Sequence, residues 1–298
     1  MPKRTICVSR HAHLSLSSGS LVIKLLDEGD VVSVSMEDIW AVILENGAST
    51  ITSAAMEALM DSGAAVMTCG QNGEPNGLCV PLCSNSRCPE VIESQLAMQK
   101  PLEKRLWQRI VVAKLGNQAH VLEILGKDAG PVRECESQVR SGDVTDRESV
   151  GAAAYFKALI PEGTRRDGPY SSPLDYGYGV LRAGLARETV AAGLLASRGI
   201  HHSSSLNPFN LVDDLIEPFR PVVDLIVLTL DLGGELTHAK KVELARVFEY
   251  SVIMGGRKVS LQEAVSEEVG TLKRAIAAKD ANELTVPALS ELEKCAPE

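Results

Sequence analysis

The first 80 residues contain short runs of apolar and β-branched positions separated by polar turns. Such runs, bounded here by Gly19, Gly29 and polar clusters, are typical of strands. Strands are predicted over residues 5–8, 14–16, 20–26, 31–34, 39–44 and 64–68. Apolar positions at helical spacing over 50–60, closed by Gly63, predict one helix. This part of the chain is therefore expected to form a β-rich domain.

Beyond residue 90 the apolar positions recur with the 3.6-residue period of a helix. The intervening segment 70–89, rich in Gly, Pro, Asn and Ser, has the composition of a linker. Helices are predicted over 91–125 with an interruption near Pro101, 147–159, 175–197, 208–217, 221–231, 240–250 and 261–279. We predict an α+β fold with a small β-rich domain over 1–80, a linker over 81–92 and a larger all-α domain over 93–298.

Composition places the chain among ordinary globular proteins. It has 298 residues, of which 45% are hydrophobic and 23% charged, and these values exclude disordered, collagen-like and coiled-coil classes. No segment reaches the roughly 18 to 20 apolar residues of a membrane span, and the start of the chain lacks the apolar region of a secretory signal. We expect a cytoplasmic protein without a membrane partner.

The charge balance limits how the chain could bind nucleic acid. It carries 30 basic and 39 acidic residues, a formal charge of −9. A polyphosphate would be repelled overall, so it would need a local basic patch or a basic partner. One basic cluster has helical spacing and consists of Lys100, Lys104, Arg105 and Arg109. A solvated helix face is the more common explanation of such a cluster.

The seven cysteines do not form a disulfide framework, because their number is odd and they are scattered along the chain. Four of them, Cys69, Cys79, Cys83 and Cys88, lie close enough in sequence to raise the question of a zinc site. Zinc ribbons usually supply close C-x-x-C pairs, whereas these cysteines are ten, four and five residues apart. Buried or loop thiols are the favoured interpretation.

The densest polar segment in an apolar setting is GIHHSSSLNPFNLVDDLIEPFRPVVD, residues 199–224. Asn207 followed by Pro208 is a helix-start signal. On the helix that follows, Asp214 and Glu217 share a face, as do residues 213 and 217. Carboxylates this close repel one another unless a cation lies between them.

A bound divalent metal would remove that repulsion, and His201 or His202 could supply an imidazole from the preceding loop. Carboxylate oxygens with one imidazole suit Mn²⁺ or Mg²⁺ better than a closed zinc site. The alternative is that these acids face water while one histidine is a core residue.

Glu148 is a second candidate because it begins a helix whose next residues are small, through Gly151 to Ala154. Small residues allow another helix to approach closely. The alternative explanation is that acids near a helix N-terminus are favoured by the macrodipole without any catalytic role.

These features occur in an order that resembles a known family, the integrases of the CRISPR adaptation machinery. The likeness rests on the β-rich start, a PNGLCVP turn over 75–81, Glu148 before its small-residue helix, YGYGVLRA over 176–183, and GIHH followed by NPFNLVDDLIEPFRP. The last motif is the most specific. Its form is most similar to the branch that accompanies type II systems.

The resemblance implies a metal-dependent DNA integrase that inserts short foreign DNA into a CRISPR repeat array, by attack of a DNA 3′-hydroxyl on a phosphodiester. It implies that Glu148, His202 and Glu217 are both the catalytic residues and the ligands of Mg²⁺ or Mn²⁺. Asp214 would be a supporting carboxylate, and the helical domain would be the catalytic one. Whether His202 is a ligand or a proton acceptor stays open.

The resemblance also implies partners: double-stranded DNA, a small second adaptation protein, and a second copy of the chain. The β-rich domain is the expected dimer contact, because an edge strand invites pairing across a two-fold axis. Candidate phosphate contacts are Arg220, Lys104, Arg105 and Arg109, although Arg220 could instead pair with Asp224. Two other functions remain open, a metal-dependent endonuclease that uses water and a non-catalytic DNA-binding scaffold.

Overall fold

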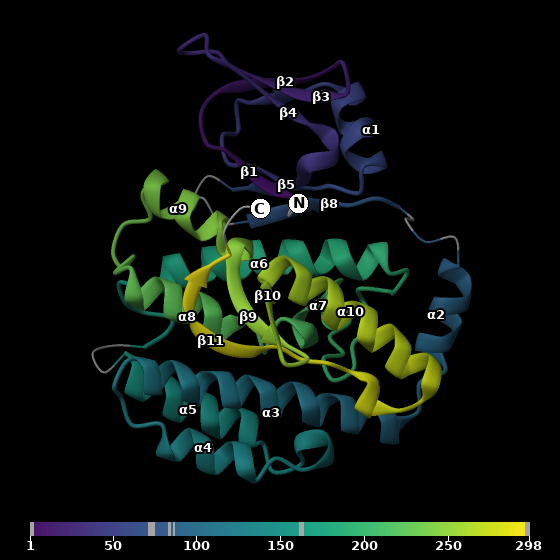
Figure 1. Ribbon diagram of the computed structural model, residues 1–298, viewed down its shortest axis with the longest axis vertical. Coiled ribbons are helices and arrows are strands. Elements are labelled where there is room, and N and C mark those ends of the chain that lie inside the picture. Colours follow the sequence, from purple (N-terminus) through teal and green to yellow (C-terminus); the bar gives the residue numbers. More distant parts are fainter. Residues whose placement is uncertain (1–2, 71–74, 83–84, 86, 161–163, 296–298) are drawn as a thin grey trace.

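The computed structural model describes residues 3–70, 75–82, 85, 87–160 and 164–295. A small part built mainly of strands lies above a larger, mainly helical part (Figure 1). The predicted order, strands first and helices after, is confirmed. Within the described residues, no helix is long and apolar enough to cross a membrane.

The N-terminal part contains two four-stranded sheets. One has the strand order β4-β3-β2-β6 and the other β1-β5-β7-β8. The elements are β1 (Arg4–Val8), β2 (Ala12–Ser17), β3 (Ser20–Leu25), β4 (Val31–Ser35), η1 (Met36–Asp38), β5 (Ile39–Leu44), β6 (Thr50–Ile51), α1 (Ser53–Asp61), β7 (Ala65–Cys69) and β8 (Pro75–Cys79).

Strand β5 connects the two parts of the molecule, because both of its faces are buried. Ile39 and Val42 belong to the N-terminal core, whereas Trp40, Ala41 and Ile43 belong to the core of the helical part. A strand covered on both faces has a continuous apolar sequence instead of an alternating one. This explains why β5 has the bounds predicted from the sequence.

Strand β8 lies where the sequence predicted a turn and the start of a linker. It pairs antiparallel with β7 and places Gly77 opposite Thr68. A Cβ at Gly77 would lie 2.3 Å from the Thr68 Oγ1, so any larger residue there requires the Thr68 side chain to rotate. Pro, Asn and Gly are uncommon in strands, but they are tolerated at the edge of a sheet, which is the position of β8.

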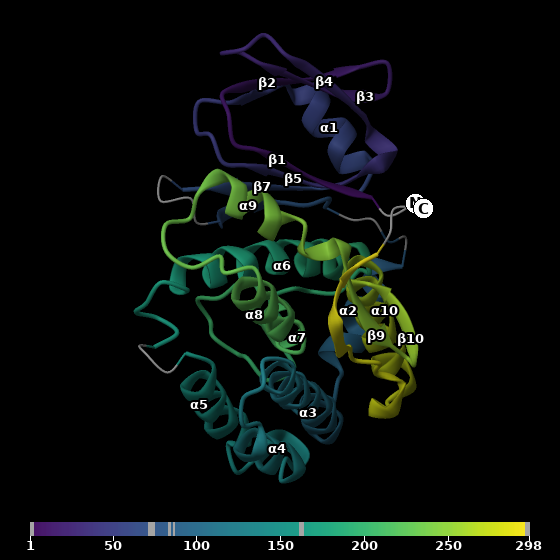
Figure 2. The same cartoon turned by 60° about the vertical axis from the view of Figure 1, so that its left-hand side comes forward.

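The helical part is built around α3, which is buried along most of its length and contacts α4, α5 and α8 (Figure 2). Its helices are α2 (Cys88–Leu96), α3 (Lys100–Ile124), α4 (Gly130–Ser137), η2 (Ser141–Asp143), α5 (Arg147–Leu159), α6 (Ser171–Ala191), α7 (Asn210–Leu215), α8 (Arg220–Thr229), α9 (His238–Ala245), η3 (Val247–Glu249), α10 (Leu261–Ala278) and η4 (Ala281–Glu283). Helix α2 begins inside the range predicted as a linker.

The larger part is not entirely helical. It contains an antiparallel sheet of the order β10-β9-β11, formed by β9 (Tyr250–Met254), β10 (Arg257–Ser260) and β11 (Ala288–Lys294). Gly255 and Gly256, both with positive φ, join β9 to β10. A Gly-Gly pair between two apolar runs is a hairpin signal. The expectation of an all-α domain missed this signal.

Candidate active site

Three elements bring two acidic side chains onto one buried ammonium group. Lys114, from the middle of α3, places its Nζ 2.7 Å from Glu148 Oε1 and 2.5 Å from Glu217 Oε2. Glu148 lies in the first turn of α5, and Glu217 lies two residues after α7. Their side chains are only 19% and 8% exposed. The alternative in which the acids of this segment face water is therefore wrong for Glu217.

The ion pairs keep both partners charged. Burial would raise the pKa of Glu217, but the neighbouring Lys114 and Arg220 charges outweigh it, and the pKa is lowered. Burial would likewise lower the pKa of Lys114, but Glu217 and Glu148 together raise it. The sequence analysis expected a cation between Glu217 and the acids at 213 and 214, whereas the cation seen here, Lys114 of α3, lies between Glu217 and Glu148.

The close approach of α5 to α3 depends on a glycine. A Cβ at Gly151 would lie 2.5 Å from Leu115 Cδ2 of α3 and 3.2 Å from Cys135 Cβ of α4. Only a residue without a side chain fits there, as the small-residue pattern predicted. Because Gly151 lies one turn after Glu148, this contact sets the distance from Glu148 to Lys114.

The N-terminus of α5 is capped by Asp143. Its two carboxylate oxygens accept hydrogen bonds from the backbone N–H groups of Arg147 and Glu148, each at 2.9 Å. This satisfies donors that a helix start otherwise leaves unpaired. The macrodipole alone does not explain Glu148, because its side chain extends to Lys114.

Asp214 organises the loop before α7. It is fully buried, and its Oδ2 accepts hydrogen bonds from the backbone N–H of Ile200 at 2.6 Å and of His201 at 3.0 Å. Its Oδ1 lies 3.1 Å from the backbone N of His202 and 2.7 Å from His202 Nδ1. A Cβ at Gly199 would lie 2.2 Å from the His202 carbonyl oxygen, so the loop requires glycine there.

The structure distinguishes the two histidines. The ring of His201 stacks on Trp107, with centroids 4.3 Å apart and planes inclined by 2°. The ring of His202 is held through Nδ1 by Asp214, which leaves Nε2 as its second ring nitrogen. The hydrogen bond to Asp214 raises the pKa of His202, and the charges of Glu217 and Glu148 add to the effect. His202 therefore lies in the field of both acids.

The third acid of this segment has a separate partner. Arg182 donates to both carboxylate oxygens of Asp213, at 2.7 and 2.8 Å. Asn207, predicted as the helix cap, also donates to Asp213, at 2.7 Å, and α7 begins only at Asn210. The three acids thus avoid mutual repulsion through three different sets of donors.

Asn210 is a structural residue of this loop that the sequence patterns did not single out. It is buried, and its Nδ2 donates to the carbonyl oxygens of Ser197 and Ser204, at 3.1 and 2.9 Å. Its Oδ1 accepts from the backbone N–H of Ser204 at 3.2 Å. The sequence did contain a signal for this role. Asn210 is the second asparagine of NPFN, and it lies too far into the helix predicted from residue 208 to serve as its N-cap.

Arg220 lies beside Glu217 rather than Asp224. Its Nε is 3.0 Å from Glu217 Oε1, and its guanidinium lies 4.8 Å from the centre of the Tyr178 ring. Asp224 accepts hydrogen bonds from the hydroxyls of Tyr178 and Tyr155 instead. Burial raises the pKa of Asp224 to about 6, against the lowering effect of these bonds.

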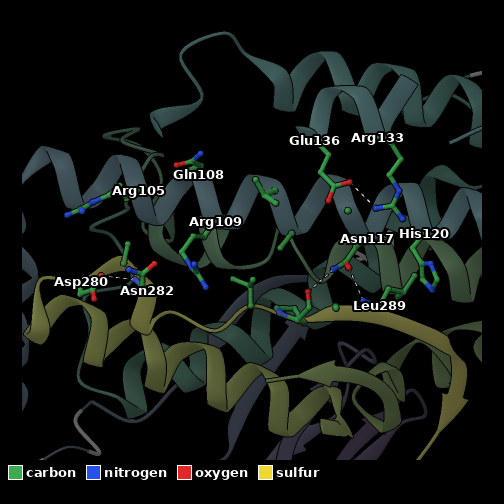
Figure 3. A pocket seen from close by; sticks show the side chains of 17 residues that line it. Arg105, Gln108, Arg109, Asn117, His120, Arg133, Glu136, Asp280, Asn282 and Leu289 are labelled. Atoms are coloured by element: carbon green, nitrogen blue, oxygen red, sulfur yellow. Dashed lines mark hydrogen bonds and ion pairs between the residues drawn. The ribbon is translucent and has the colours of Figure 1, made fainter. Parts of the chain in front are cut away.

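The other proposed phosphate contacts lie on α3, and two of them, Arg105 and Arg109, line a separate cavity. A cavity of about 670 Å³ opens between α3, α4 and the segment before β11, with Arg105 at one end (Figure 3). Arg109 donates from Nε and Nη2 to the Leu284 carbonyl oxygen, at 3.2 and 2.9 Å. Lys104 packs against Gly142, and Lys100 pairs with Glu103 at 2.7 Å. Arg109 thus holds the C-terminal segment in place.

Within the described ranges, no group of three or more His, Cys, Asp or Glu side chains is arranged to hold a metal ion. This includes Cys69, Cys79 and Cys88 of the considered zinc site, while Cys83 lies outside the described residues. Lys114 stands between the two glutamates. The donor set of two carboxylates and an imidazole held by a further carboxylate still has the chemistry that Mg²⁺ or Mn²⁺ requires.

Comparison with known proteins places the chain in a family. The family model described as CRISPR associated protein Cas1 matches residues 6–262. The CRISPR-associated endonuclease Cas1 of Neisseria meningitidis serogroup C is 36% identical over 302 residues, 99% of each chain. A Cas1 endonuclease of Pyrobaculum aerophilum is 27% identical over 79% of this chain and 86% of its own.

Solved structures share the fold at lower identity. A casposase bound to integration product has a TM-score of 0.78 at 19% identity, over 94% of this chain and 92% of its own. A Cas1 protein from Thermotoga maritima has a TM-score of 0.74 at 14% identity, over 97% and 100%. These likenesses extend over both the strand-rich part and the helical part of the chain.

Proposed function

The chain belongs to the Cas1 family of CRISPR-associated proteins, and on this basis we propose that it is a metal-dependent DNA integrase. It would join the 3′-hydroxyl end of a short foreign DNA to a phosphodiester of a CRISPR repeat array. The observation that carries the proposal is the convergence of Glu148 and Glu217 on one buried cation, beside His202. These three residues come from three separate segments: the first turn of α5, the loop before α7 and the α7–α8 junction.

Glu148, Glu217 and the Nε2 of His202 would hold Mg²⁺ or Mn²⁺. A divalent ion in such a site lowers the pKa of an attacking hydroxyl and neutralises charge that develops on the phosphate. Asp214 fixes the orientation of the His202 ring through the 2.7 Å contact to Nδ1. Arg220 adds a guanidinium next to Glu217, where it could contact a phosphate of the DNA.

His202 has two possible duties at this position. Both ligation and acceptance of the proton from the attacking hydroxyl require a neutral imidazole with a free Nε2. The Asp214 hydrogen bond leaves that nitrogen available in either case. The same bond explains why His202, rather than the stacked His201, would act.

The proposed partners are DNA and a small protein related to Cas2. Structural neighbours include a Cas6-RT-Cas1–Cas2 complex and the casposase with its integration product. A chain with a net charge of −9 would gain from a partner that supplies basic surface along the DNA. We also propose a homodimer through β4, an edge strand with Val31 and Val32 exposed to 59% and 50%.

A metal-dependent endonuclease is the second candidate, favoured by the name of the N. meningitidis relative. The same residues would hold the ion, and water would take the place of the DNA 3′-hydroxyl. Integrase and endonuclease thus differ in the nucleophile and not in the site.

A strand-joining assay tests the proposal. The protein with its small partner and Mn²⁺ or Mg²⁺ should join a labelled DNA 3′-end to a repeat-containing duplex. Glu148→Gln and His202→Ala should reduce joining to background, whereas His201→Ala, the matched control one residue away, should keep most of it.

Three other outcomes would count against the proposal in different ways. Joining that persists in both Glu148→Gln and His202→Ala contradicts the assigned site. Hydrolysed fragments alone, under all conditions, favour the endonuclease. DNA binding with neither product favours a non-catalytic scaffold.

A further inference from the structure

We propose that Lys114 is a built-in counter-ion that occupies the acid pair until DNA arrives, so that metal binding and DNA binding are coupled. The inference rests on the proposed function and deepens it, because it names a regulation of the same site. Its starting point is the position of one ammonium nitrogen between Glu148 and Glu217.

The ammonium of Lys114 and a metal ion compete for the same oxygens. The Nζ contacts of 2.7 Å to Glu148 and 2.5 Å to Glu217 are charge-assisted hydrogen bonds of full strength. A divalent ion such as Mg²⁺ needs carboxylate oxygens at about 2.0–2.1 Å. Two cations cannot share this space without strong repulsion, so the lysine must leave when the metal binds.

The displaced ammonium needs another anion. Lys114 is rooted in a buried stretch of α3, where an unpaired charge is strongly unfavourable. The other buried acids of α3 and its neighbours are engaged: Glu103 with Lys100 and Arg198, Asp143 with the backbone of α5, Asp214 with the histidine loop, and Asp224 with two tyrosines. The anion that enters a site for phosphodiester chemistry is a phosphate.

A flexible lysine is well suited to this exchange. Its compact ammonium at the end of a four-carbon stem can move from a carboxylate pair to a phosphate oxygen. When the Lys114 ammonium donates to a phosphate oxygen of the DNA, Glu148 and Glu217 become free to bind the metal. By linkage, the metal must then raise the affinity for DNA by the same factor.

The coupling predicts opposite behaviour for two variants of one residue. Lys114→Met removes the cation between the two carboxylates and leaves only Arg220 beside Glu217, so the metal should bind the pair with less competition. Lys114→Arg keeps a cation between the acids, so metal binding should remain weak until DNA is present. Lys157→Met, a change at an exposed lysine of α5 that has no proposed role in binding, should behave as the unchanged chain.

Titration calorimetry of the full chain with Mn²⁺ tests this, with and without a repeat duplex whose 3′-ends lack hydroxyls so that no joining occurs. Without DNA, the Kd of Lys114→Met for Mn²⁺ should be at least about tenfold lower than that of the unchanged chain, or about 1.4 kcal/mol. The DNA should lower the Kd for Mn²⁺ of the unchanged chain, of Lys157→Met and of Lys114→Arg, and leave that of Lys114→Met nearly constant.

The opposite results would overturn the inference. If Lys114→Met binds Mn²⁺ no more tightly than the unchanged chain, Lys114 does not compete with the metal. If DNA changes the Kd for Mn²⁺ equally in Lys114→Met and in the unchanged chain, Lys114 does not couple metal binding to DNA binding. If Lys114→Met does not fold, tight binding of Mn²⁺ by Lys114→Arg without DNA contradicts the competition in the same way. Glu217→Gln distinguishes failure of the proposed metal site from failure of the Lys114 inference. An unchanged Mn²⁺ affinity in Glu217→Gln would show that Glu217 does not hold the metal, whatever Lys114 does.

Discussion

Buried carboxylates in this protein differ in whether a donor reaches them. Glu217 has Lys114 and Arg220 as neighbours, and Asp214 accepts hydrogen bonds from backbone N–H groups of its loop. Glu268, in the interior of α10, is fully buried, and neither carboxylate oxygen has a hydrogen-bond partner among the described residues. The first two carboxylates are paired with donors, whereas the unpartnered Glu268 is a cost to stability.

Glu268→Gln should make the protein more stable at neutral pH than at acidic pH, relative to the unchanged chain. Burial raises the pKa of Glu268 well above its usual 4.5, so the folded chain keeps a proton that the unfolded chain releases. The contribution of Glu268 to the free energy of unfolding is fully present below the pKa of the unfolded chain. It is lost as the pH rises toward the higher pKa of the folded chain. Because glutamine carries no titratable proton, Glu268→Gln does not lose stability at this position as the pH rises.

Thermal unfolding between pH 5 and pH 8 checks this prediction. The Tm difference between Glu268→Gln and the unchanged chain should grow with pH, and the same substitution at the exposed Glu57 serves as the surface control. A Tm difference for Glu268→Gln that does not change with pH would show that this carboxyl does not titrate differently on unfolding.

The burial of Lys114 could be predicted from the sequence, but its partners could not. Lys114 follows Ile110 by four residues and Val111 by three, so it lies on the buried face of α3. A lysine on an apolar face is seldom fully buried unless it is paired, and this is a signal for an acidic partner. The identity of the partners could not be predicted, because Glu148 and Glu217 meet it only through the packing of α5 and the α7–α8 junction.

Among the helices and strands, the sequence was most informative where one pattern dominates. Strand β5 and helix α5 have the predicted bounds because a continuous apolar run and a clear helical period define them. Strands β8 and β11 were missed, because their sequences PNGLC and ALSELEK carry residues that are uncommon in strands. Their strand conformation comes from pairing with β7 and β9.

Gly151→Ala and Gly270→Ala should have opposite effects on stability. A methyl group at Gly151 meets Leu115 and Cys135, and overpacking of this kind costs about 1–3 kcal/mol. Nothing lies within 4 Å of a Cβ at Gly270 in α10, where alanine should gain about 0.5–1 kcal/mol from its helix propensity.

Thermal unfolding and strand joining measure the two glycine variants. Gly151→Ala should lower the Tm and reduce joining, because α5 moves Glu148 away from Lys114. Gly270→Ala should raise the Tm slightly and leave joining intact. A Gly151→Ala protein with unchanged Tm and full activity would show that the α3–α5 contact does not set the site.

In the molecule as a whole, the exposed apolar residues of the N-terminal part have no cover among the described residues of one chain. Leu26, Val31 and Val32 are 45%, 59% and 50% exposed, and β4 is the outer strand of its sheet. Exposed, apolar edge strands pair with other chains unless charges or bulges prevent it. A second copy of the chain would satisfy this edge and place two catalytic parts at a fixed separation.

Val32→Lys should convert the proposed dimer to a monomer, because a charge on the pairing edge is unfavourable when the edge is covered. Light scattering after gel filtration should give about twice the chain mass of 31.9 kDa for the unchanged protein and the single-chain mass for Val32→Lys. Leu230→Lys, at a residue 42% exposed elsewhere, should remain dimeric. Equal masses for the unchanged protein and Val32→Lys would reject β4 as the contact.

Anomalous diffraction from crystals soaked in Mn²⁺ with DNA bound would locate the divalent ion that Glu148, His202 and Glu217 are proposed to hold. We expect a single strong anomalous peak within coordination distance of all three side chains, with the Lys114 ammonium turned away from the glutamates. If the crystallised complex is active in strand joining but shows no anomalous peak at this position, or shows its only peak elsewhere, these residues do not form the metal site.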